Sequence, residues 1–202
     1  MNFSEYVASH PGYREIKNVS TPDPALKINL VLLQTDFAAE SLNWLQKNPE
    51  IGKLMGDDFS NLSLEGERKR IQDILSSKDE YSWCIKDHDH IIGNVSINFI
   101  AEKTKLFGVR TGSIAIIIWD KSCWNRKVAR SVNAAILDWA FNEGGFEVMV
   151  CRIFSHNIAS IKSFIALRFE EDGTEIDGTA FWNKYKLTKE HWQELKAGTI
   201  QE

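Results

Sequence analysis

Cysteine is scarce in this chain, and the cysteines that occur form no familiar pattern. There are three, Cys84, Cys123 and Cys151. Their number is odd and no two are spaced as Cys-x-x-Cys, which argues against a disulfide framework and against a zinc site built on paired thiolates. A reduced compartment, the cytoplasm, is therefore the simplest expectation.

Long apolar runs are also lacking. No run reaches the roughly 20 residues that a membrane-spanning helix needs. The first residues, Met1 to Tyr13, include Glu5, His10 and Pro11 and have no apolar core of the kind found in secretion signals. We therefore expect no membrane partner.

An excess of positive charge is lacking as well. The 28 acidic side chains outnumber the 24 basic ones and give a net charge of −4, which argues against a nucleic-acid partner. Residues 87–90 alternate aspartate and histidine, but adjacent ligands on a short hairpin turn make a poor metal site, and no supporting partners are apparent in the sequence. We therefore expect no bound metal.

The length and composition suit one large globular domain. The chain has 202 residues, of which 43% are hydrophobic and 26% charged, as in ordinary globular proteins. We expect an N-terminal leader at 1–24, a single domain at 25–195 and a tail at 196–202. Apolar periodicity predicts strands at 26–33, 81–86, 91–100, 114–119, 147–154, after 169 and at 179–187, and helices at 36–48, 63–77, 128–142, 157–167 and 189–195. Residues 87–90 and 102–110 are expected to be hairpin connections.

The most informative stretch is 112–142, which predicts a buried strand, a polar connection and a helix. The start of this helix carries three cations, Arg126, Lys127 and Arg130. A helix N-terminus already has partial positive charge and unpaired N–H groups. Further cations are favourable there if an anion such as phosphate occupies the site. The alternative is that all three are solvated surface cations whose stems cover apolar surface.

Two blocks of sequence resemble the GNAT family of acetyl-CoA-dependent N-acetyltransferases. Trp-Asn-Arg-Lys-Val-Ala at 124–129 is similar to the pyrophosphate loop of that family, which follows a buried strand and opens a helix. Asn157 to Ile161, followed by Ala166 to Phe169, is similar to its second block. The resemblance spans roughly 25–195 and is nearest to the branch that acetylates the N-termini of ribosomal proteins. It implies an α/β (α+β) GNAT fold, with a central mixed, mostly antiparallel twisted sheet flanked by helices.

The resemblance also implies roles for particular residues. The pyrophosphate of acetyl-CoA would be held at the loop by Trp124, Asn125, Arg126, Lys127, Val128, Ala129 and Arg130. Backbone N–H groups of the strand, at Ile116, Ile118 and Trp119, would polarise the thioester carbonyl. Asn157 would bond the pantetheine arm, and Ser160 would be the catalytic residue, close to the leaving sulfur. Judged by residue type alone, Asn157 is equally a helix N-cap, and Ser160 equally a capping or packing residue.

Three positions of the two blocks depart from the family pattern. Lys127 stands where the family has its first glycine, and Arg168 stands where it usually has glycine before phenylalanine. We expect Lys127 to be tolerated only with an ordinary backbone conformation and a side chain that points away. Phe164 stands where many relatives have a tyrosine that acts as an acid.

A general base is also missing from its usual place. Many relatives carry a glutamate at the start of the strand, where this chain has Ser113 or Ile114. The remaining candidates are Asp57 and Asp58, in a loop expected to border the acceptor groove, and His156, whose imidazole can titrate near neutral pH.

The resemblance implies an N-acetyltransferase that moves the acetyl group of acetyl-CoA directly to a primary amine in a ternary complex. The acceptor would be a small molecule or a peptide, such as a protein N-terminus, and a homodimer is a candidate assembly. The alternative is a non-catalytic protein of the same fold, which either binds acyl-CoA through a degenerate loop or acts as an interaction protein.

Overall fold

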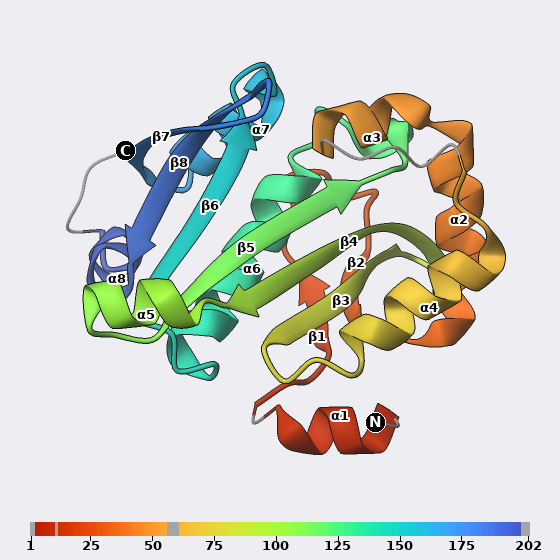
Figure 1. Cartoon of the computed structure of the whole chain (residues 1–202), viewed down its shortest axis with the longest axis horizontal. Helices are drawn as coiled ribbons and strands as arrows, with labels where there is room; N and C mark the ends of the chain where they lie inside the picture. Colours follow the sequence, from red (N-terminus) through yellow and green to blue (C-terminus); the bar gives the residue numbers. More distant parts are fainter. Residues whose placement is uncertain (1–2, 11, 56–60, 199–202) are drawn as a thin grey trace.

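The computed structural model describes residues 3–10, 12–55 and 61–198. A twisted sheet runs across the molecule, with helices on both of its faces (Figure 1). The strands are β1 (Ile16–Val19), β2 (Ile28–Leu32), β3 (Glu80–Asp87), β4 (His90–Phe99), β5 (Thr111–Ile118), β6 (Val148–Phe154), β7 (Glu170–Asp177) and β8 (Ala180–Thr188). The helices are α1 (Phe3–Ser9), η1 (Thr35–Phe37), α2 (Ala38–Lys47), α3 (Pro49–Met55), α4 (Leu64–Ile74), α5 (Ala101–Phe107), η2 (Lys121–Cys123), α6 (Val128–Asn142), α7 (Ile158–Ile165) and α8 (Lys189–Lys196).

The sheet confirms the expected mixed, mostly antiparallel arrangement. Its strand order is β1-β2-β3-β4-β5-β6-β8-β7. Every neighbouring pair is antiparallel except β5 and β6, which run parallel. The connection between these two strands is α6, as a parallel crossover requires.

The two faces of the central strands differ in character. Tyr81 and Trp83 of β3 pack against Trp139 of α6, with ring centroids 5.1 and 4.9 Å apart. Because side chains alternate across a strand, Ser82 points to the opposite face. There Ser82 lies beside Asn94 of β4, whose amide donates to its hydroxyl at 3.1 Å.

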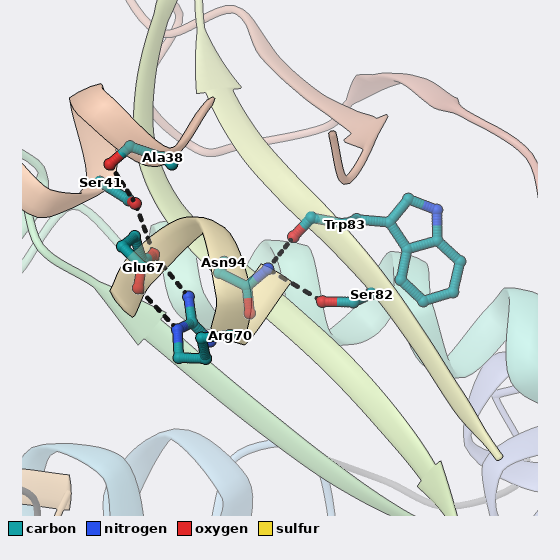
Figure 2. A network of polar contacts seen from close by, with 7 residues as sticks. All are labelled: Ala38, Ser41, Glu67, Arg70, Ser82, Trp83 and Asn94. Atoms are coloured by element: carbon teal, nitrogen blue, oxygen red, sulfur yellow. Dashed lines mark hydrogen bonds and ion pairs between the residues drawn. The ribbon is translucent and has the colours of Figure 1, made fainter. Parts of the chain in front are cut away.

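A buried carboxylate of α4 links this helix to α2 on the second face (Figure 2). Glu67 is completely buried. Its carboxylate accepts two hydrogen bonds from the Arg70 guanidinium, both 2.8 Å long, and one from the Ser41 hydroxyl at 2.6 Å. These partners satisfy the buried charge, which would otherwise be costly. The two helices are thereby fixed to one another beside the sheet.

The N-terminal segment contributes to the sheet and to the core. Residues 16–19 form β1, a strand that the sequence did not predict, and it pairs with β2. Tyr6 and Tyr13 are both buried, and their hydroxyls donate to the carbonyls of Glu80 and Ser82. The indole of Trp139 donates to the Gly12 carbonyl at 2.8 Å.

The predicted hairpin connection at 102–110 does join the antiparallel strands β4 and β5, but it contains a helix that the sequence analysis did not predict. Residues 101–107 form helix α5, which ends at Gly108 with φ 72°. The segment contains alanine, glutamate, lysine and leucine, all good helix formers, followed by the glycine that commonly ends a helix. The other expected strands and helices are present, with ends shifted by a few residues.

Within the described residues, no helix combines the length and the apolar character that crossing a membrane would demand.

Candidate active site

The C-terminal half of β5 has an open edge. The strand pairs with β4 from Gly112 to Ile118, but with β6 only over its first three residues. The N–H of Trp119 donates to the Ile92 carbonyl of β4 at 2.9 Å. Because backbone groups alternate in direction along a strand, the N–H groups of Ile116 and Ile118 point away from β4, toward the gap left by β6.

A cleft of about 480 Å³ lies along this open edge. Its walls come from α3, β5, the loop after η2, the start of α6, and α7. Such a volume is typical of a small-molecule site. The cleft therefore joins the two sequence blocks that the family resemblance singled out.

Most of the residues expected to hold or act on acetyl-CoA line the cleft. These are Ile116, Ile118, Trp124, Asn125, Lys127, Val128, Ala129, Arg130, Asn157 and Ser160. Trp119 and Arg126 lie outside the lining. The Trp119 side chain is buried, and its indole donates to the Ile91 carbonyl at 3.0 Å.

The cleft also contains residues that the sequence did not suggest. Ile51 and Leu54 come from α3, and no local pattern marks them because they are far from both blocks in the chain. Lys162 and Ser163 belong to α7. Ser163 could have been found, since it follows Ser160 by three residues and so shares its helix face.

The loop before α6 is left-handed at two residues that are not glycine. Asn125 has φ 61° and Lys127 has φ 62°. Asparagine visits this region readily, but lysine does so at a cost of about 1 kcal/mol. The expectation of an ordinary conformation at Lys127 was therefore wrong: the chain keeps the glycine-type backbone without the glycine. Arg168 repeats this behaviour in the second block, with φ 65°.

The start of α6 faces the cleft without a side-chain cap. The side chain of its N-cap residue, Lys127, makes no capping hydrogen bond. The first backbone hydrogen bond of the helix runs from the Ser131 N–H to the Lys127 carbonyl, at 3.0 Å. The N–H groups of the first turn are thus available to an anion. Lys127 and Arg130 line the cleft beside them, and Lys162 lines it from α7.

Arg126 is engaged with the N-terminal segment. Its Nε donates to Asp23 Oδ2 at 2.7 Å, and about a third of each side chain is exposed. The hydrogen bond from Arg126 lowers the pKa of the Asp23 carboxyl, and a backbone hydrogen bond from Ala25 adds to this effect. Asp23 therefore stays charged in the folded protein.

Asn157 is the N-cap of α7. Its side-chain oxygen accepts from the Ser160 N–H at 3.2 Å, and its amide donates to the Leu54 carbonyl at 3.5 Å. The cap fixes the first turn of α7 so that Ser160, which is half-buried, contributes to the cleft wall. Ser160 itself lies three residues into the helix and is not its cap.

Comparisons with known proteins agree with this geometry. The model of the acetyltransferase (GNAT) domain matches residues 27–170. The chain belongs to the GNAT acetyltransferase family. None of the curated proteins matches this GNAT sequence closely enough to count as a relative.

Solved structures share the GNAT fold at low identity. The chain is similar to Mycobacterium smegmatis RimJ in complex with a CoA disulfide, with TM-score 0.75 and 16% identity over 94% of this chain and 97% of that one. It is similar to RimL, a ribosomal alpha-N-protein acetyltransferase in complex with coenzyme A, with TM-score 0.70 and 16% identity over 81% and 95%. It is also similar to spermidine N-acetyltransferase from Vibrio cholerae in complex with CoA and spermine, with TM-score 0.69 and 16% identity over 82% and 98%.

The GNAT cleft carries few groups that could move a proton. Among the described residues, its lining includes no carboxylate, histidine or tyrosine. Burial raises the pKa of the Cys123 thiol, which keeps that lining residue uncharged. His156 is exposed and stacks on Phe154, with ring centroids 5.1 Å apart, outside the lining. Asp57 and Asp58 fall outside the described residues, and the described part of the chain holds no cluster of three or more metal-ligating side chains.

Proposed function

We propose that this GNAT protein is an N-acetyltransferase that uses acetyl-CoA as its cosubstrate and acts on a primary amine. One observation carries the proposal: an uncapped helix N-terminus and an open strand edge face the same cleft. The first is a site for phosphate, and the second offers N–H donors to a carbonyl oxygen. Buried free cysteines suit the reduced cytoplasm, where we place the enzyme.

The cleft residues suit the phosphates and the pantetheine arm of acetyl-CoA. The first-turn N–H groups of α6, with Lys127, Arg130 and Lys162, would hold phosphate charge. Ile51, Leu54 and the strand residues give an apolar wall for the pantetheine arm. Asn157 both caps α7 and lies in the lining, so its structural role and a bond to the arm are compatible.

Acetyl-CoA supplies an activated carbonyl carbon bonded to sulfur. The N–H groups of Ile116 and Ile118 would donate to its oxygen as negative charge develops there. The amine nitrogen bonds to the carbon and the carbon–sulfur bond breaks. The Ser160 hydroxyl would donate to the departing sulfur. The proton lost by the amine would leave through water, because the described residues that line the cleft include no carboxylate or histidine.

The acceptor would approach over the face of the sheet opposite α6. Ala115 is exposed although it lies in the middle of a central strand, so this part of the face is uncovered. It pairs with Ser96 of β4, and its neighbour Ser113 pairs with Asn98. These polar side chains suit an amine. Structurally similar proteins include a spermidine acetyltransferase and an aminoglycoside acetyltransferase, so polyamines, amino sugars and peptide N-termini are the acceptors to compare.

Calorimetric titration with acetyl-CoA tests the cofactor half of the proposal. We expect binding at micromolar strength, with adenosine diphosphate binding much more weakly. A panel of polyamines, aminoglycosides and short peptides would follow, with release of the CoA thiol as the signal. No detectable binding of acetyl-CoA would overturn the proposal.

Ser160→Ala tests the role at the leaving sulfur. We expect turnover to fall by about tenfold or more, as for loss of an acid catalyst, while the affinity for CoA changes little. Ser163→Ala is the matched control, because it removes a hydroxyl from the same helix face. Equal losses of turnover and affinity in Ser160→Ala would indicate that Ser160 serves in packing.

One observation favours the second candidate, a non-catalytic protein that binds acyl-CoA. Phe164 lies in the cleft wall at the place of the tyrosine acid found in many relatives. On this hypothesis CoA binds, but no amine in the panel increases thiol release. The calorimetric and kinetic experiments together separate the two functions.

A further inference from the structure

An ion pair joins the segment before β2 to the loop before α6, residues 124–127, which we call the phosphate loop. Asp23 and Arg126 are 103 residues apart in the chain, yet Asp23 Oδ2 accepts from Arg126 Nε at 2.7 Å. The other carboxylate oxygen accepts from the Ala25 N–H at 3.0 Å, and the Asp23 carbonyl accepts from the Thr21 hydroxyl at 2.8 Å. Pro22 and Pro24 restrict the backbone on either side. Contacts within its own segment therefore orient Asp23 independently of Arg126.

Arg126 lies between the two left-handed residues of the loop. Asn125 and Lys127 flank it, with φ 61° and 62°. A strained backbone of this kind persists only where surrounding contacts over-determine it. The side chain of Arg126 supplies such a contact, because the ion pair fixes the residue between the two unusual conformations.

We propose that Asp23 is a positioning residue of the phosphate loop. By fixing Arg126, it keeps Lys127 left-handed, and this conformation directs the first-turn N–H groups of α6 into the cleft. The inference rests on the proposed binding of CoA and adds a residue from the N-terminal segment, which does not line the cleft. It also gives Arg126 a role in shaping the loop, distinct from direct contact with phosphate.

A second ion pair from the same segment offers a matched control. Arg14 donates to Glu143, just after the end of α6, through Nε at 2.8 Å and through a terminal nitrogen at 2.6 Å. Both ends of α6 are thus joined to the N-terminal segment, Arg14 bonding the residue after its C-terminal end and Asp23 bonding the phosphate loop. Arg14→Gln should leave the affinity for CoA unchanged.

The first experiment compares two substitutions of Asp23 by calorimetry with CoA. Asp23→Asn keeps an oxygen for Arg126 and removes the charge, so we expect its affinity to stay within about twofold of the wild type. Asp23→Ala removes both, and the affinity should fall by about three- to fivefold, the range expected for a partly exposed ion pair. If Asp23 only competed with phosphate for Arg126, both substitutions would strengthen binding.

The second experiment is a double-mutant cycle that separates strain from charge. Lys127→Ala and Lys127→Gly both remove the lysine charge, but only glycine is free of strain at positive φ. Asp23→Ala should weaken CoA binding by about three- to fivefold in the alanine background and by less than about twofold in the glycine background. Thermal unfolding of each variant confirms that it is folded.

The outcomes distinguish this inference from the function on which it rests. Equal losses in both backgrounds, no loss in either, or tighter binding would overturn the positioning role alone. If the wild-type chain does not bind CoA, the proposed function fails and the inference fails with it.

Discussion

Lys127 holds a backbone conformation that glycine adopts freely. At φ 62° its Cβ is strained, and the cost is about 1 kcal/mol or more relative to an ordinary conformation. Glycine would remove this strain but would gain entropy in the unfolded chain, which offsets part of the benefit. The small net cost explains how lysine can replace glycine here while the loop keeps its left-handed backbone.

The relative stability of the glycine and alanine variants at position 127 is a direct prediction. We expect Lys127→Gly to unfold at a higher urea concentration than Lys127→Ala, by about 0.5–1 kcal/mol in the free energy of unfolding. At a helix interior the order is reversed, because alanine is the better helix former. Ala134, inside α6, provides that comparison through Ala134→Gly. Alanine more stable than glycine at 127 would contradict a left-handed loop.

Glu80 predicts a pH dependence of stability. Burial raises the pKa of its carboxyl, and the nearby Arg70 opposes this only in part. A raised pKa means that folding favours the protonated form. The stabilising effect of the protonated form is complete below the pKa of the unfolded chain and is lost as pH rises through the folded pKa.

Glu80→Gln should therefore gain stability relative to the wild type as pH rises from about 4 to 7, because glutamine stays neutral. Urea denaturation at several pH values measures this difference. Glu65→Gln is the control, since Glu65 is exposed on α4. A difference between Glu80→Gln and wild type that does not change with pH would show that Glu80 titrates as it does in the unfolded chain.

The junction of α2 and α4 depends on one completely buried carboxylate. Glu67→Ala would leave the Ser41 hydroxyl and the Arg70 guanidinium without their shared acceptor. We expect a loss of about 1–3 kcal/mol, because the buried Ser41 hydroxyl loses its charged acceptor, whereas the exposed Arg70 guanidinium can still be solvated. Asp73→Ala is the control: it removes the exposed Lys69–Asp73 pair of the same helix and should cost less than about 1 kcal/mol. Similar midpoints in chemical denaturation for the two variants would refute the structural importance of the buried network.

Elements with continuous apolar patterning were predicted, whereas β1, which is fixed by a distant partner, was not. The strand at β5 and the helix at α6 have continuous apolar patterning, and both are present. The four residues of β1 carry almost no pattern, because only Val19 of the strand is buried. They become a strand by pairing with β2.

The residues of the candidate site also fall into those that the sequence predicted and those that it did not. The two sequence blocks located most of the cleft lining, because each block is continuous in the chain. Ile51 and Leu54 could not be predicted from the sequence, because only the tertiary structure brings α3 next to the cleft. The contact of Asp23 with Arg126 was invisible for the same reason, as were the left-handed conformations of Lys127 and Arg168, where residue type suggested the opposite.

The described residues of the N-terminal segment contact several elements that are distant in the sequence. Tyr13 packs its ring against Trp83 at 4.9 Å, and Trp83 in turn contacts Trp139 of α6. Gly12 and Arg14 bond the C-terminal end of α6, and Asp23 bonds the loop before it. The division into a leader at 1–24 and a domain from 25 is still a prediction, and these contacts make it testable.

Removal of residues 1–24 is the test at the scale of the whole molecule. The truncated chain would lose two buried tyrosines, and large core aromatics contribute about 3–5 kcal/mol each, against a typical total of about 5–15 kcal/mol. It would also expose Tyr81, Trp83 and Trp139, which the segment covers. We therefore expect the truncated chain to lose cooperative unfolding by calorimetry and to bind a hydrophobic dye, whereas Tyr13→Phe, which removes only the hydroxyl bonded to Ser82, should still unfold cooperatively. A truncated chain that melts as sharply and at the same temperature as the full chain would show that 25–195 folds independently of the leader.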